Sequence, residues 1–266
     1  MILVNIGCGE VHHPAWINLD VAPSAPDVRR YDARRPLPFA TGTVDGVYHA
    51  HLLEHLSADD AQAFFGECRR VLRADGVMRV VVPDLEGIAQ AYLRGLAEAR
   101  GGAEPTLWKW TRLELTDQLG REESGGEMAV FARQLTAGQI ARVRERAGAE
   151  IDGMLREPDS RRRHVTFGKI ARRAHREFAR ALMFLIGGRP MRRMFDVGWF
   201  RQSGEVHRVM YDALSLSQAL LDGGFVDPQR VSATESRIPE FARHGLDAVD
   251  GRVRKPDSLF VEAIRP

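Results

Sequence analysis

Two glycines near the N-terminus, Gly7 and Gly9, follow directly on an apolar run that begins at Ile2. A short apolar run of this kind is typical of a buried parallel strand. Glycine lets the backbone turn sharply and come close to a bound ligand, because it has no side chain to clash. The pair Gly7 and Gly9 therefore predicts a nucleotide-type site where this first strand ends.

Acidic residues follow the next two predicted strands: Asp20 ends one apolar stretch, and Asp32 ends the segment 27–32. A dinucleotide fingerprint needs a third glycine and an acid about 20 residues further on. Here His12 occupies the position of that glycine and Asp20 follows Gly9 closely, which disfavours NAD. Aspartate is also common in turns and helix caps, but the regular position after successive strands favours a binding role, with a ribose as the expected partner of Asp20.

Histidines are the candidates for acid–base chemistry, because histidine titrates near neutral pH. His51 follows a predicted strand at 43–49, at the sheet edge where open α/β proteins bind their ligands. His207 precedes a predicted helix that should pack over the nucleotide pocket, with Tyr211 one turn along. We expect His207 as the first candidate base and His51 as the second. A histidine that only forms hydrogen bonds at this junction is an equally open interpretation of His207.

The segment His51-x-x-Glu54-His55 also matches the inverted zinc-peptidase motif. That motif requires a helix holding two ligands on one face, with a further carboxylate ligand downstream. Here the segment directly follows a predicted strand. We therefore interpret Glu54 and His55 as a structural pair that fixes the loop, assign no metal ligand, and keep zinc hydrolysis as the less favoured alternative.

The elements that position these residues alternate between strand and helix over residues 1–85. A helix is expected from an N-cap at Ser57 to about Arg73, ended by residues 74–76, and a further strand at 77–82. This alternation predicts a doubly wound parallel sheet. The link between the first two strands is too short for a crossover helix, so we expect the site to be open there.

The pattern changes between residues 86 and 200, where predicted helices are separated by glycine pairs at 101–102, 125–126 and 187–188. We interpret this region as a helical, partly basic lid insertion. The α/β pattern returns in residues 201–266, with a capped helix near 215–221. The last two predicted strands, residues 225–233 and 258–264, are expected to form an antiparallel pair at the sheet edge.

The bulk composition is that of an ordinary globular protein, with 266 residues, 44% of them hydrophobic and 28% charged. A formal charge of +2 gives no global reason to expect a nucleic-acid partner. The two cysteines, Cys8 and Cys68, make no disulfide framework or zinc cluster, which fits a reducing compartment. With no signal peptide or long apolar run, the sequence predicts a cytoplasmic location.

One region departs from this balance: residues 156–193 contain twelve Arg or Lys against three Asp or Glu. Within it lies the apolar stretch Phe178–Ile186. A basic amphipathic helix can lie on an anionic membrane, as a peripheral contact, or hold a phosphorylated substrate. A solvated arginine face on a lid helix is the simpler interpretation, and we favour it.

Taken in chain order, these segments resemble the class I S-adenosylmethionine-dependent methyltransferases, in particular the small-molecule group with Leu-Glu-His after the fourth strand. The resemblance covers residues 2–85 strongly and 204–265 more loosely. The matching residues are Asn5-Ile-Gly-Cys-Gly9, Asn18-Leu-Asp20, Asp32 before Leu37-Pro-Phe39, Asp45, Leu53-Glu54-His55, and Arg70-Val-Leu-Arg-Ala-Asp-Gly76.

The resemblance implies a Rossmann-like, seven-stranded, mostly parallel sheet with a helical lid insertion, and S-adenosyl-L-methionine as the cofactor. It implies that the glycine loop approaches the amino-acid part of the cofactor, that Asp20 binds the ribose and that Asp32 binds the adenine amino group. The short turn after Gly9 departs from the family pattern. The expected cofactor-binding residues are Asn5, Gly7, Cys8, Gly9, Asp20, Asp32 and His51.

The sulfonium of this cofactor is already a strong electrophile, so the protein must mainly hold an acceptor atom in line with the methyl group and exclude water. We expect transfer to a hydroxyl of a small molecule or of a glycan or lipid-linked acceptor, with His207, His51 and Tyr211 as the candidate catalytic residues. A non-catalytic, methyltransferase-like binding module is the alternative.

Overall fold

The computed structural model describes residues 1–148, 150–155 and 167–266, with the backbone alone described over 167–172. Residues 156–166, which belong to the basic region singled out above, lie outside the described residues.

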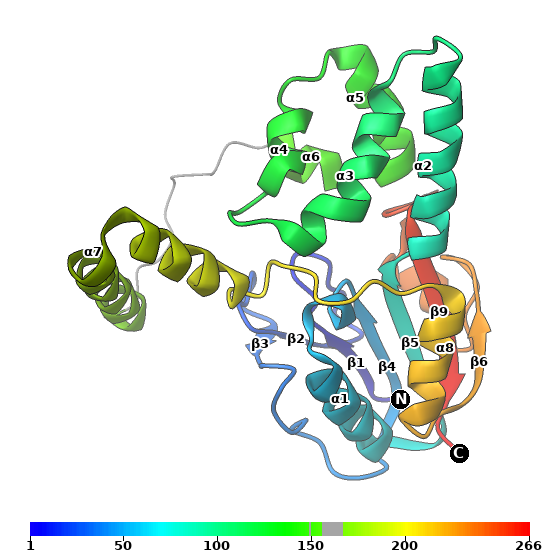
Figure 1. The fold of residues 1–266 in the computed structure, drawn as a ribbon. Helices are drawn as coiled ribbons and strands as arrows, with labels where there is room; N and C mark the ends of the chain where they lie inside the picture. The colour runs from blue at the N-terminus through cyan, green and yellow to red at the C-terminus, as the bar shows by residue number, and fades with distance from the viewer. Residues whose placement is uncertain (149, 156–166) are drawn as a thin grey trace.

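A seven-stranded sheet lies at the centre of the molecule, in the order β3-β2-β1-β4-β5-β9-β6 (Figure 1). Strands β1 to β5 pair in parallel, whereas β9 is antiparallel to both β5 and β6. This confirms the predicted mostly parallel sheet and its antiparallel edge. The strands are β1 (Leu3–Ile6), β2 (Ile17–Asp20), β3 (Val28–Arg30), β4 (Val44–Ala50), β5 (Leu72–Pro83), β6 (Val226–Arg230) and β9 (Ser258–Ile264).

The short link between β1 and β2 holds no helix, as predicted. The link between β2 and β3 also holds no helix, so strand and helix do not alternate throughout residues 1–85. Strand β4 is followed by the short 3-10 helix η1 (Leu53–His55) and then by α1 (Ala58–Val71). Ser57 caps α1 as expected, accepting a hydrogen bond from the backbone N–H of Asp60. The prediction was wrong at the other end of α1, because β5 already begins at Leu72 and includes residues 74–76.

The two faces of the sheet are covered differently. Helices α1 and α8 (Ala213–Asp222) pack on one face, where Phe64 and Leu216 are fully buried. The opposite face is covered by residues 231–257, which hold the 3-10 helix η2 (Phe241–His244) and the small hairpin of β7 (Ala248–Val249) and β8 (Arg252–Val253). This segment takes the place of the missing crossover helices and buries an aromatic cluster that includes Trp16, Tyr48 and Phe241.

A buried ionic cluster fixes this cover to the sheet. Arg79 on β5 is 0% exposed and donates hydrogen bonds at 2.8 Å to Asp247, in the covering segment, and to Glu262 on β9. Its guanidinium also donates to the backbone carbonyls of Ser232 and Glu235. Every charged member of this cluster is therefore paired.

The insertion between β5 and α8 is helical and has a core of its own, formed by side chains such as Trp110, Val143 and Ile151. Helices α2 to α6 lie above the carboxyl ends of the strands, and α7 projects away from the sheet (Figure 1). The helices are α2 (Leu85–Arg100), α3 (Thr106–Gly120), α4 (Gly126–Ala132), α5 (Ala137–Ala147), α6 (Glu150–Leu155) and α7 (Phe167–Arg201).

The glycine pairs lie at the joints of these helices, as predicted. Gly101 follows α2, Gly125 precedes α4 with a left-handed backbone, and Gly187 and Gly188 break α7. Within the described part of the chain, no helix combines the length and the apolar character needed to cross a membrane.

Candidate functional site

A first cavity, of about 340 Å³, lies at the carboxyl ends of β1 and β2 and is lined by Gly7, Asp20, Asp32 and His51, among others. Gly7 has a φ of +68°, and a Cβ at this position would lie 3.2 Å from the side chain of Leu52. The backbone conformation therefore favours glycine there, and a side chain would in addition crowd Leu52. The two acids and the glycine that the sequence singled out lie on one cavity.

The two carboxylates of the first cavity have different partners. Asp20 accepts hydrogen bonds from the backbone N–H groups of Gly9 at 2.9 Å and Ala22 at 2.7 Å, so it fixes the glycine loop. Asp32 lies two residues beyond the end of β3 rather than at its last residue. Arg34 donates to it at 2.9 and 2.7 Å, and this hydrogen bonding lowers the pKa of Asp32.

A second cavity, of about 280 Å³, lies on the other side of the glycine loop and is lined by Asn5, Gly7, Cys8, Gly9 and His51. The amide of Asn5 donates to Asn18 at 3.1 Å and is fully buried, which gives it a structural role. Burial raises the pKa of Cys8 to about 11, with Asp20 adding to the effect, so the thiol stays protonated at neutral pH.

Two basic residues that the sequence did not single out, Arg254 and Lys255, also line the second cavity. They come from the segment that covers the sheet in place of a crossover helix. Lys255 is one of only three lysines in this arginine-rich chain, but nothing in the local sequence links it to the glycine loop.

A third cavity, of about 360 Å³, lies between the sheet and the insertion, and His51 lines it together with Glu54, His55, His207 and Gln118 of α3. His51 lines all three cavities and so stands at their junction. Its ring nitrogen Nε2 lies 3.0 Å from the Ser258 hydroxyl, and Nδ1 lies 3.2 Å from a carboxylate oxygen of Glu54.

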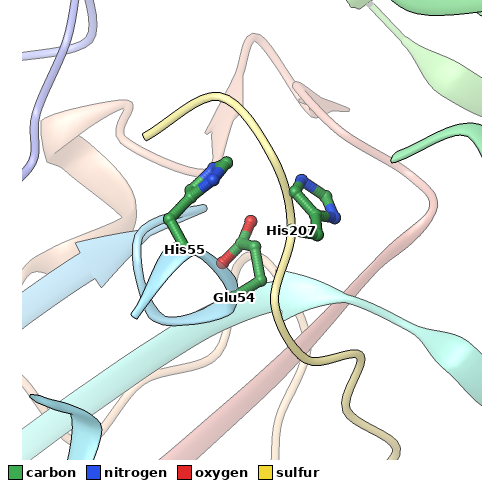
Figure 2. A group of neighbouring side chains, drawn as sticks. All are labelled: Glu54, His55 and His207. Carbon is green, nitrogen blue, oxygen red and sulfur yellow. The ribbon is translucent and has the colours of Figure 1, made fainter. Parts of the chain in front are cut away.

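Three of these side chains form a compact group, in which one ligand atom each from Glu54, His55 and His207 lies within 4.8 Å of the others (Figure 2). Such a group could hold a metal ion, although the sequence analysis assigned no metal ligand. The backbone carbonyl of Glu54 accepts a hydrogen bond from the N–H of Arg208 at 2.7 Å, and the N–H of His207 donates to the carbonyl of Gln118 at 3.0 Å. The group is therefore held between η1, the segment after α7, and α3.

The group is strongly desolvated. Burial acts to raise the pKa of the Glu54 carboxyl, but the adjacent His51, together with His55 and His207, lowers it to about 2. Burial lowers the pKa of His207 to about 3, against the opposing charge of Glu54. At neutral pH His207 is thus uncharged and a weaker base than a free histidine.

Tyr211, the third candidate catalytic residue, has a different position from the one predicted. No helix lies between the end of α7 at Arg201 and the start of α8 at Ala213, so Tyr211 is not one helical turn from His207. Its ring is packed in the core beneath α8, and Tyr211 is not among the residues that line the three cavities. Its position gives no support to a catalytic role.

The geometry of the inverted zinc-peptidase motif is not met. His51 has a φ of +52°, and Glu54 and His55 lie in a 3-10 helix of three residues, so the two motif histidines do not share one face of an α-helix. The neighbour that completes the group is His207, which is 152 residues from His55 in the sequence. No local pattern could have linked the two.

The parallel strand order, with the glycine loop and two strand-end acids around one cavity, defines a Rossmann-like protein with a nucleotide-type site. Residues 4–80 match the family model of a methyltransferase domain. This segment contains Gly7, Asp20, Asp32 and His51. The match indicates a methyltransferase domain in this part of the chain, for which S-adenosyl-L-methionine is the cofactor.

Solved structures give looser likenesses. A SAM-dependent methyltransferase from Archaeoglobus fulgidus has a TM-score of 0.40 and 11% sequence identity, over 99% of this chain and 86% of that one. A SAM-dependent methyltransferase from Thermotoga maritima has a TM-score of 0.38 and 9% identity, over 100% of this chain and 82% of that one. No curated protein matches the chain. We take neither an acceptor nor a residue role from these likenesses.

Proposed function

We propose that this protein is an active enzyme, which transfers the methyl group of S-adenosyl-L-methionine to a hydroxyl of a small-molecule, glycan or lipid-linked acceptor. One observation carries the proposal: His51 lines the two cavities beside the glycine loop and also the third cavity under the insertion. A cofactor on one side of His51 and an acceptor on the other would meet at this side chain.

In this arrangement the cofactor supplies an activated methyl group, and the residues of the first two cavities hold it. Each oxygen of Asp20 accepts one backbone N–H, which leaves acceptor capacity for the ribose hydroxyls. Asp32 would accept from the adenine amino group. Arg254 and Lys255 line the second cavity and would bind the carboxylate of the methionine part by charge-assisted hydrogen bonds.

The residues of the third cavity hold the acceptor and take its proton. The hydroxyl oxygen forms a bond to the methyl carbon as the carbon–sulfur bond breaks, and that electron pair stays on sulfur, giving neutral S-adenosylhomocysteine. The hydroxyl proton passes to His51, which is the general base in this proposal. His207 is buried and its pKa is about 3, so it suits this role less well.

Isothermal titration calorimetry with S-adenosylmethionine and S-adenosylhomocysteine tests the cofactor site. We expect Asp20→Ala to weaken binding by about 100-fold, because the charge-assisted hydrogen bond that Gly9 of the loop donates to Asp20 is lost along with the ribose contact. Asp27→Ala is the matched control, since Asp27 faces solvent and pairs with His12 at the surface. Equal affinities of wild type and Asp20→Ala would contradict the assignment.

Release of S-adenosylhomocysteine in the presence of a panel of sugars, polyols and phenols tests transfer. We expect His51→Gln to lower kcat by roughly 10²–10⁴-fold, as for the loss of a general base. Cofactor binding without turnover on any hydroxyl acceptor would support the alternative of a non-catalytic binding module. Transfer only to amines or carbon acids would overturn the hydroxyl assignment.

The lipid-linked class of acceptor is supported by the surface of α7. Phe178, Leu185 and Ile186 are 70%, 80% and 64% exposed, with the exposed Arg189 nearby. An exposed apolar helix face with a basic residue just beyond the Gly187–Gly188 break is suited to an anionic lipid surface. Co-sedimentation with vesicles containing phosphatidylglycerol should fall in a Leu185→Glu/Ile186→Glu variant, and equal binding of this variant would count against a membrane-bound acceptor.

A further inference from the structure

The side chains of Glu54, His55 and His207 have the composition and spacing of a metal site. A carboxylate and two imidazoles are a common ligand set for divalent transition metals, and three protein ligands leave coordination positions open. Atoms bound to one ion at about 2.0–2.2 Å lie roughly 3–3.5 Å apart. The three ligand atoms already lie within 4.8 Å of one another, so small side-chain rotations would bring them onto an ion.

The Glu54 carboxylate lacks the hydrogen bonds that a buried charge requires. It is 0% exposed, and neither of its oxygens has a hydrogen bond of full geometry from the described residues. The contact with His51 Nδ1, at 3.2 Å, lowers the pKa of Glu54 but leaves most of the acceptor capacity of the two oxygens unused. Leaving a buried polar group unsatisfied costs about 1–3 kcal/mol, and more when it is charged. The two oxygens therefore indicate a ligand that the protein side chains do not supply.

The two histidines are oriented to supply nitrogen ligands. His55 Nδ1 lies 3.4 Å from the carbonyl oxygen of Val206, and because a carbonyl can only accept, the lone pair of His55 is then on Nε2. Metal-binding histidines commonly donate their other N–H to a backbone carbonyl in this way. Nδ1 of His207 is buried and has no partner among the described residues. Figure 2 shows the Glu54 carboxylate between the two rings, whose centroids are 4.8 Å apart.

The backbone holds this group in place before any ligand binds. The carbonyl of Glu54 is bonded to the N–H of Arg208, and the N–H of His207 is bonded to α3 through the carbonyl of Gln118. Ligands fixed on rigid, cross-linked segments lose little freedom on binding an ion.

We propose that Glu54, His55 and His207 bind one divalent transition-metal ion, with its open coordination positions facing the third cavity. The site itself is independent of methyl transfer, but its role rests on the proposed function. Positive charge here would stabilise the negative charge that develops on the acceptor hydroxyl as its proton leaves for His51. His51 stays outside the ligand set, which distinguishes this site from the zinc-peptidase motif.

Metal binding can be tested without an acceptor. Chelator-treated wild type is titrated with Mn²⁺, followed by the electron paramagnetic resonance signal of the free ion, and with Zn²⁺ by calorimetry. We expect one equivalent of ion to bind. Glu54→Gln and His207→Asn should each weaken binding by at least about 100-fold. His175→Asn, which changes an exposed histidine on α7, should bind as the wild type does.

The outcomes separate this proposal from the proposed function, because S-adenosylmethionine is titrated into the same samples. The metal site is wrong if chelator-treated wild type binds neither ion, or if both variants, folded by circular dichroism, bind like wild type. Cofactor binding and methyl transfer in that case would still stand. Stoichiometric ion binding that both variants lose supports the metal site, even if no methyl transfer is found.

Discussion

Two buried charged clusters lie on the same sheet and differ in whether their charged groups have hydrogen-bond partners. Around Arg79, the charged partners Asp247 and Glu262 are paired with it at 2.8 Å, and the remaining guanidinium N–H groups reach backbone carbonyls. Around Glu54, both carboxylate oxygens are buried without a hydrogen bond from the described residues. Both clusters join segments that are far apart in the sequence.

This difference in hydrogen bonding indicates a structural role for the Arg79 cluster and a ligand-binding role for the Glu54 cluster. A satisfied network fixes one segment on another, and the Arg79 cluster does this for residues 231–257 over the sheet. An unsatisfied network weakens the fold unless a ligand completes it. Asp247 of the Arg79 cluster lines the second cavity, but its carboxylate is held by Arg79, over which the Phe241 ring lies with its centroid 4.3 Å from the guanidinium carbon. The Glu54 cluster faces the third cavity with its carboxylate oxygens lacking such partners.

The largest effect on stability is expected from Arg79→Met. This change leaves Asp247 and Glu262 buried without their cation, which typically costs 3–5 kcal/mol, and we expect a loss of about that size. Urea unfolding followed by circular dichroism measures it. Arg69→Met is the control, because Arg69 is exposed and makes one hydrogen bond, to the carbonyl of Gly224. A loss below about 1 kcal/mol for Arg79→Met would break the comparison, since the satisfied cluster would then not stabilise the cover.

His49 allows the cost of a buried polar group without hydrogen-bond partners to be measured at a position outside the three cavities. It is fully buried on β4, and neither ring nitrogen has a partner among the described residues. Burial lowers the pKa of His49 from its usual value of 6.5 to about 4, against the opposing charge of Glu54. The unfolded chain therefore binds a proton as the pH falls below about 6.5, while the folded chain does not until about 4.

This proton uptake lowers the free energy of unfolding as the pH falls from about 6.5 to 4, by about 3 kcal/mol at pH 4. His49→Leu should remove that part of the acid sensitivity, and denaturant unfolding at several pH values measures it. In His175→Leu, which changes an exposed histidine, the acid sensitivity should remain. If the free energy of unfolding of His49→Leu falls with pH as steeply as that of the wild type, a buried polar group without partners costs no stability. The unpaired oxygens of Glu54 would then be no evidence for a missing ligand.

The same substitution in the two clusters gives the most direct contrast. Glu262 accepts hydrogen bonds from Arg79 and from the backbone N–H of Arg237 at 2.8 Å, so Glu262→Gln should cost about 2–3 kcal/mol. In chelator, Glu54→Gln should change the free energy of unfolding by less than about 1 kcal/mol, since the substitution loses the ion pair with His51 at 3.2 Å but also removes a buried charge. Equal losses in urea unfolding would show that the clusters are energetically alike.

The smallest effect is expected for a surface ion pair. Arg73 and Asp45 are 2.7 Å apart, with 51% and 23% of their side chains exposed. Exposed pairs contribute about 0–1 kcal/mol, so Arg73→Ala should lower the free energy of unfolding by no more than that, and less at high salt. A loss comparable with that of Arg79→Met would mean that ion pairing, rather than burial and full bonding, determines stability in this chain.

Much of the sheet could be predicted because the local sequence of each strand is enough to identify it. Strand β9 was predicted at Ser258–Ile264, as observed, and β4 within one residue at each end, since both segments are short and rich in apolar residues. The cover over residues 231–257 was not foreseen. It depends on contacts such as Arg79 with Asp247, which are 168 residues apart and have no local pattern.

Only part of the candidate site could be predicted from the sequence. Gly7, Asp20 and Asp32 follow strands, and strand ends of a parallel sheet share one edge, so their common cavity could be inferred from chain order. The partners of Glu54 could not be inferred, because His207 lies on a segment without regular structure between α7 and α8. Its backbone bond to Gln118 of α3 depends on how the insertion packs on the sheet.

The place of β9 between β5 and β6 has a consequence for synthesis on the ribosome. Residues 258–264 are translated after both of the strands that they join. Until they emerge, the nascent chain carries β5 with an open edge and with Arg79 lacking Glu262. Exposed strand edges invite association with other chains, so the arrival of β9 between β5 and β6 also closes the edges at which the sheet could pair with a second chain.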